Sequence, residues 1–95
     1  MRNQLYIDGS WVAGSGTLDV IDPSDGTVIT QVATSSDEQN LAAIAAADKA
    51  SASWAATAPR VRGEILRKAF EIMIAEADSI AELISRENGK ALPDA

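Results

Sequence analysis

Few residue types in this chain could carry chemistry, because its 95 residues include no Cys and no His. Thiol nucleophiles, imidazole bases, disulfides and zinc–thiolate sites are therefore excluded within these residues. Three regularly spaced acids, Asp19, Asp22 and Asp25, suggest a calcium loop. Pro23 and the lack of a distal Glu do not fit such a loop. We therefore expect no catalytic residue in this chain.

Lys90 follows an Asn-Gly pair, which suggests a phosphate site. The Gly-rich turn that would point backbone N–H groups at a phosphate is missing, so we expect no cofactor-binding residue here. Lys90 is better explained as a cation near a helix C-terminus. Trp11 and Trp54 could form an aromatic ligand box, but large single aromatics more often anchor packing.

The net charge of −6 argues against nucleic acid and against an anionic membrane surface as partners. No apolar run approaches the length of a membrane span. The start of the chain also lacks the apolar region of a signal peptide. A soluble cytoplasmic protein is therefore expected, with no membrane association.

The first third of the chain predicts short strands, at residues 5–7, 11–12, 18–20 and 27–32. Asp8-Gly9 is a hairpin turn signal, and residues 22–26 carry Pro, Asp and Gly where a turn needs them. Residues 13–16 read as a flexible tip between strands. Together these features predict an antiparallel meander that needs a packing partner.

Helical patterns fill the rest of the chain. Ser36 and Gln39 match a capping box at the start of an Ala-rich helix, and Pro59 suits the first turn of a second one. That second helix is amphipathic; a break near residues 78–79 and an end at Gly89 are expected. The fold class is α/β, or α+β for this piece alone, with short antiparallel strands followed by two or three helices. We expect residues 1–95 to have no internal domain boundary.

Several of these stretches, in this order, resemble the amino-terminal segment of the aldehyde dehydrogenase superfamily. They are the strand Leu5-Tyr6-Ile7-Asp8-Gly9-Ser10-Trp11, the turn Asp22-Pro23-Ser24-Asp25-Gly26, the Ala-rich helix ending near Trp54, the helix start from Arg62 to Leu66, and Glu87-Asn88-Gly89-Lys90-Ala91-Leu92. The family usually has Asn where this chain has Asp22, and either residue suits the turn. The last segment is most similar to succinate-semialdehyde dehydrogenases.

The resemblance implies part of a cofactor-binding domain in an enzyme that oxidises an aldehyde to a carboxylic acid with NAD or NADP. In that family a Cys thiolate attacks the aldehyde and a Glu-activated water cleaves the thioester. Neither group can be placed on this chain, so catalytic residues and cofactor contacts are expected elsewhere. The implied partners are the remainder of the enzyme and its subunits, in a homo-oligomer. The 95-residue chain alone is expected to be inactive and to bind no nicotinamide cofactor.

The resemblance also implies one metal site, for a monovalent cation. Some family members bind such an ion through backbone oxygens before the turn and through an acid before the Asn-Gly-Lys segment. The matching positions here are Val20, Ile21 and Glu87. Carbonyl and carboxylate oxygens suit a hard cation. The plainer interpretation is that Glu87 lies at the surface in the last turn of a helix.

Two functional hypotheses follow. The chain is the amino-terminal part of an aldehyde dehydrogenase, or it is a freestanding acidic binding or scaffolding module without enzymatic activity. A freestanding module should bury its apolar stripes, whereas part of a larger domain should leave them exposed.

Overall fold

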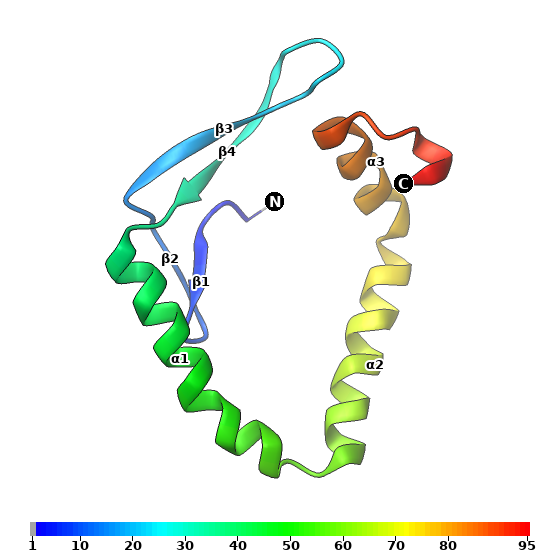
Figure 1. The fold of residues 1–95 in the computed structure, drawn as a ribbon. Helices are drawn as coiled ribbons and strands as arrows, with labels where there is room; N and C mark the ends of the chain where they lie inside the picture. Colours follow the sequence, from blue (N-terminus) through cyan, green and yellow to red (C-terminus); the bar gives the residue numbers. More distant parts are fainter. Residues whose placement is uncertain (1) are drawn as a thin grey trace. The chain divides into compact units, whose positions relative to one another are not determined.

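The computed structural model describes residues 2–95, which form four strands, three α-helices and a final 3₁₀ turn (Figure 1). The element bounds are β1 Leu5–Ile7, β2 Ser10–Val12, β3 Gly16–Ile21, β4 Val28–Thr34, α1 Asp37–Ala56, α2 Pro59–Ala75, α3 Ala77–Asn88 and η1 Leu92–Asp94. The chain divides into two compact units: residues up to Val20 together with Thr30–Ala56, and Ile21–Ile29 together with Thr57–Ala95. The order of strands before helices confirms the expected α+β piece.

The β1–β2 hairpin forms as its turn signal predicts. Tyr6 lies opposite Trp11 in an antiparallel register, so the loop contains only two residues. Both loop residues have positive φ angles, 50° at Asp8 and 77° at Gly9. This is the conformation of a type I′ turn, whose twist matches the two strands and which Asp-Gly adopts readily.

The strands form two separate two-stranded sheets, β1–β2 and β3–β4, where one continuous meander was expected. The segment expected as a flexible tip is held in place, because the Ser15 backbone N–H donates to the Thr34 carbonyl over 2.9 Å. Asn3 makes a second link to β4, where its carbonyl accepts the Ala33 N–H over 2.8 Å. The Ser15 bond extends the β3–β4 pair, and the Asn3 bond links the chain before β1 to β4 without forming one continuous sheet, so the meander prediction was wrong.

Helix α1 begins with the predicted capping box. The Ser36 N–H donates to Gln39 Oε1 over 3.1 Å, and the Gln39 N–H donates to Ser36 Oγ over 3.2 Å. Gln39 also donates its side-chain amide to the Ala13 carbonyl over 2.9 Å, which ties this end of α1 to the chain after β2. The capping box that the sequence predicts therefore forms at the start of α1.

Helix α2 begins with Pro59 in its first turn, as expected, although Ala58 provides no side-chain cap. The break between α2 and α3 falls at Glu76, earlier than the predicted residues 78–79. Ser79 does not cap α3; its hydroxyl donates to the Glu76 carbonyl over 2.9 Å. The predicted end at Gly89 is confirmed, because Gly89 has φ 74° and its N–H donates to the Ser85 carbonyl.

No residue in the described part of the chain is buried, so this piece has no hydrophobic core of its own. Phe70 is 62% exposed and Met73 60%, although both lie on the apolar face of α2. Leu41 and Ile44 of α1 are each 66% exposed. These faces satisfy the criterion stated above for part of a larger domain. Among residues 2–95, no helix is both long and apolar enough to span a membrane.

Candidate functional site

The three predicted cation residues lie at the ends of two elements. Val20 and Ile21 are the last residues of β3, where Val20 is half-buried and Ile21 is 43% exposed. Glu87 is exposed in the last turn of α3. Their backbone and carboxylate oxygens are hard donors of the right chemical type. The cation site stays a prediction.

The turn after Ile21 is built from two short hydrogen-bonded loops. Asp22 Oδ1 accepts the Ser24 N–H at 2.9 Å and the Ser24 hydroxyl at 2.6 Å. Asp25 Oδ1 accepts the Thr27 N–H at 2.9 Å and the Thr27 hydroxyl at 2.7 Å. Each aspartate side chain therefore accepts a hydrogen bond from the backbone N–H two residues later, which is a common role of Asp in turns. These aspartates stabilise the turn, in agreement with the rejected calcium-loop interpretation.

This turn lies against the C-terminal end of α3 within one compact unit. A Cβ atom placed on Gly89 would lie 3.4 Å from Pro23 Cγ, so the helix cap lies close to the turn. The positive charge of Arg86 also acts on the Asp25 carboxylate. The structure thus brings together the neighbours of Ile21 and the neighbours of Glu87.

The pKa of Asp25 lies below its ordinary value of 3.8, first because the Thr27 backbone N–H donates to the carboxylate. The Thr27 hydroxyl lowers the pKa further, desolvation opposes these two effects, and the charge of Arg86 lowers the pKa by less than desolvation raises it. A depressed native pKa stabilises the folded chain above the unfolded pKa, and this contribution is lost as pH falls through the native value. No charge pattern in the sequence predicts the lowered pKa of Asp25, although Asp25 lies in the predicted turn and Thr27 follows it by two residues.

Replacing Thr27 by Ala is expected to raise the pKa of Asp25 toward 3.8, because one of its two donors is removed. Thr27→Ser keeps the hydroxyl and is the matched control, for which the pKa should stay depressed. An NMR titration of the Asp25 carboxyl resonance measures both. Equal pKa values in the two variants would show that the hydroxyl does not stabilise the carboxylate.

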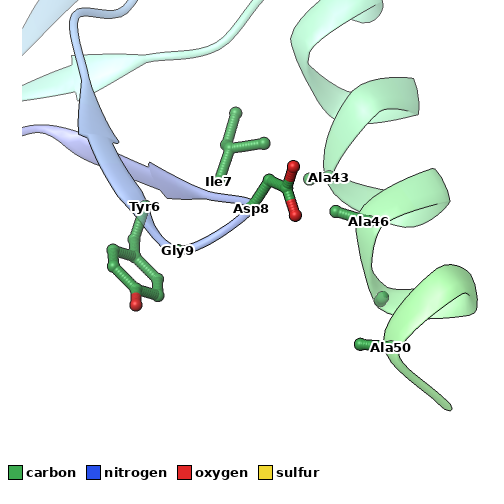
Figure 2. A pocket seen from close by; sticks show the side chains of 8 residues that line it. Tyr6, Ile7, Asp8, Gly9, Ala43, Ala46 and Ala50 are labelled. Atoms are coloured by element: carbon green, nitrogen blue, oxygen red, sulfur yellow. The ribbon is translucent and has the colours of Figure 1, made fainter. Parts of the chain in front are cut away.

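A hollow of about 290 Å³ lies between the β1–β2 turn and α1. Figure 2 shows the Asp8 carboxylate directed toward Ala43 and Ala46 of α1, with Ala50 further along the same helix face. The Ala face of α1 therefore approaches the hairpin, whereas Leu41 and Ile44 of the same helix are exposed. Apart from the Asp8 carboxylate and the Tyr6 hydroxyl, the lining is apolar or glycine. We therefore interpret the hollow as a packing surface.

A second hollow of about 420 Å³ lies beside Asn3 and Gln31. Asn3 donates its side-chain amide to Thr30 Oγ1 over 2.9 Å, while its buried Oδ1 atom accepts no hydrogen bond from the described residues. The lining consists of amides, hydroxyls, glycines and alanines. Neutral groups of this kind can orient water or a backbone segment but supply no general acid or base.

The two tryptophans do not form the ligand box considered above. Trp11 stacks at a tilt on Tyr6 with ring centroids 5.0 Å apart, and the Arg2 guanidinium lies 4.9 Å from the Trp11 ring centroid. Trp54 is 43% exposed near the end of α1. The observed contacts of Trp11 are packing contacts within the hairpin.

A sequence model described as the aldehyde dehydrogenase family matches residues 11–95 of this chain. The chain belongs to the aldehyde dehydrogenase family. It is 41% identical over 93 residues to N-succinylglutamate 5-semialdehyde dehydrogenase of Caulobacter sp. (strain K31), a match that covers 97% of this chain and 19% of that protein.

Solved structures of family members show the same arrangement of elements. Succinate-semialdehyde dehydrogenase from Burkholderia pseudomallei matches with a TM-score of 0.91 and 35% identity, over 97% of this chain and 20% of that one. A betaine aldehyde dehydrogenase point mutant from Staphylococcus aureus, in complex with NAD+, matches with a TM-score of 0.93 and 30% identity. That match covers 98% of this chain and 20% of the other chain. The chain thus spans about a fifth of the length of these aldehyde dehydrogenases.

Proposed function

We propose that this chain is the amino-terminal part of an NAD(P)-dependent aldehyde dehydrogenase that oxidises an aldehyde to a carboxylic acid. The observation that carries the proposal is the family match over residues 11–95. Succinate semialdehyde is the first substrate to test, because similar family members are named for semialdehydes that also bear a carboxylate. The reacting groups lie outside this chain, which has no Cys.

The chain's proposed contribution is structural. Its apolar α1 and α2 faces are exposed, and in the whole enzyme the remainder of the domain or a neighbouring subunit covers them. The same exposure counts against the freestanding acidic module, which should bury these stripes. We propose that the whole enzyme is cytoplasmic and homo-oligomeric.

Bound nicotinamide would supply the hydride acceptor for the reaction, but the residues here do not fit the dinucleotide. The hollow beside α1 is lined by residues 6–9 of the hairpin, including the Asp8 carboxylate, and by alanine methyl groups from the middle of the helix. A carboxylate repels a diphosphate, and no helix N-terminus faces this hollow to attract one. We therefore place no cofactor contact on this chain.

We further propose that Val20, Ile21 and Glu87 contribute oxygen ligands to a monovalent cation in the whole enzyme. The proximity of Pro23 to Gly89 supports this, because the chain just after Ile21 lies close to the end of α3. The negative end of the α3 dipole lies at Glu87, which favours a cation there.

The 95-residue chain alone is expected to show no NAD(P)-dependent aldehyde oxidation, whereas the whole enzyme should oxidise succinate semialdehyde. Formation of NADH or NADPH, followed by absorbance, measures both preparations with each cofactor in turn. Glutarate semialdehyde and betaine aldehyde serve as comparison substrates. Aldehyde oxidation by the pure 95-residue chain would refute the structural role, and inactivity of the whole enzyme on all three aldehydes would contradict the proposed activity.

Replacing Glu87 by Ala in the whole enzyme is expected to weaken the dependence of thermal stability on potassium concentration, because one charged ligand is lost. Glu82→Ala is the matched control, since Glu82 is an exposed acid earlier in the same helix. Thermal melting across a potassium series, at constant ionic strength, measures the effect. An unchanged potassium dependence in the Glu87 variant would remove the cation proposal.

A further inference from the structure

The Asn88–Gly89 peptide at the end of α3 has the two partners of an intramolecular reaction next to each other. Asn88 is the last residue of the helix, and Gly89 caps it with φ 74°. Both residues are exposed. A glycine after an asparagine carries no side chain to hinder approach of its backbone nitrogen to the asparagine amide carbon.

The side-chain carbonyl of Asn88 is already polarised. Its Oδ1 atom accepts the Lys90 backbone N–H over 2.9 Å. Attack on the amide carbon would place negative charge on this oxygen, and a backbone N–H aimed at that charge stabilises the transition state. The electrophile of the reaction therefore has its hydrogen-bond donor in place in the folded chain.

The nucleophile is held back by one hydrogen bond. The Gly89 N–H donates to the Ser85 carbonyl over 2.9 Å, which is the last backbone bond at this end of α3. While that bond is closed, the nitrogen keeps its proton directed into the helix. Helix ends fray, so this bond opens far more often than the chain unfolds.

We propose that Asn88 is a site of spontaneous deamidation, gated by opening of the Gly89–Ser85 hydrogen bond. The Gly89 nitrogen, having lost its proton, bonds to Cγ of Asn88; the Cγ–Nδ2 bond breaks and ammonia leaves with the proton. One water molecule then opens the resulting succinimide at either carbonyl. The product is an aspartate or an isoaspartate at position 88, with one added negative charge beside the helix C-terminus.

The consequence is a slow loss of the α3 cap. A carboxylate at the negative end of the helix dipole is unfavourable, and an isoaspartate adds a methylene group to the backbone at the residue that precedes the cap. Because Pro23 lies close to Gly89, displacement of the cap would also affect the turn at residues 22–26.

Incubation of the intact 95-residue chain at neutral pH, followed by peptide mapping with mass spectrometry, tests the site. Conversion at Asn88 should exceed that at Asn3 and Asn40, which precede the larger residues Gln4 and Leu41. Conversion at position 88 that is no faster than at these two internal controls would overturn the proposal.

A matched pair of variants tests the gate. Glu82→Gly loosens α3 and Glu82→Ala does not, while both remove the same exposed carboxylate. Deamidation at Asn88 should be roughly fivefold faster in the Gly variant, the ratio that corresponds to about 1 kcal/mol of helix stability. Hydrogen exchange of the Gly89 amide should accelerate in parallel. If the two Glu82 variants differ in hydrogen exchange at the Gly89 amide but deamidate Asn88 at equal rates, the proposal that the Gly89–Ser85 hydrogen bond controls deamidation is wrong.

Discussion

Replacing Phe70 by Ala is expected to lower the free energy of unfolding of the whole enzyme by about 3–5 kcal/mol, the usual cost of removing a buried Phe side chain. In the 95-residue chain the same change should cost less than about 1 kcal/mol, as surface substitutions do. Phe70 is 62% exposed in this chain, so little apolar area is lost there. The proposal that the rest of the enzyme covers α2 requires this difference. Urea denaturation followed by circular dichroism measures both values.

Lys68→Ala is the control for the Phe70 experiment, because Lys68 is an exposed residue of the same helix. Its effect should be small in both proteins. A Phe70→Ala enzyme whose stability is unchanged would show that this face of α2 stays exposed in the whole molecule. The freestanding-module hypothesis would then regain support, because the α2 face would be free for another partner.

Local structure was predictable from the sequence wherever one short-range interaction decides the conformation. The Asp8-Gly9 turn, the Ser36–Gln39 capping box and the Gly89 cap each depend on residues at most four positions apart. Asp, Ser and Gly favour these conformations through their own backbone angles and hydrogen bonds. Such features need no tertiary partner, so the sequence alone was enough to predict them.

The incorrect predictions concern features that tertiary packing decides, such as where a helix breaks and which of its faces contacts a neighbouring element. The sequence contains a capping pattern at Ser79, yet its hydroxyl bonds the Glu76 carbonyl and the helix breaks at Glu76. The hairpin is approached by the Ala face of α1, although Leu41 and Ile44 are more apolar. The Ala-rich composition of α1 indicates a close approach to a neighbouring element, but it does not indicate which side of the helix makes that approach.

The candidate site illustrates the same limit. The turn bonds of Asp25 depend on a residue two positions away, and its pattern is visible in the sequence. The charge of Arg86 acts on Asp25, and Gly89 lies close to Pro23; the residues of each pair are more than sixty positions apart in the sequence. No periodicity or motif of this chain encodes such pairs, and only the family resemblance, through its cation site at Val20, Ile21 and Glu87, indicated in advance that the turn lies near the end of α3.

Replacing Gly14 by Ala is expected to destabilise the chain by about 1–3 kcal/mol, the range for overpacking. The added Cβ atom would lie 2.2 Å from the Thr34 carbonyl oxygen and 2.9 Å from Ala33 Cβ. Rotation of a side chain cannot relieve a clash with backbone, so the segment must move away from β4. The Ser15–Thr34 hydrogen bond should then break, and faster hydrogen exchange at the Ser15 amide would report it.

Gly63→Ala is the matched control for this prediction, and its expected sign is opposite. Gly63 lies inside α2 with no neighbouring atom within 4 Å of an added Cβ, so Ala should stabilise the chain by about 0.5–1 kcal/mol. Both substitutions reduce the entropy of the unfolded chain by the same mechanism. The difference between them in urea denaturation therefore isolates the native-state clash at Gly14. Stabilisation by both substitutions would mean that residues 13–16 are as free to move as the sequence first suggested.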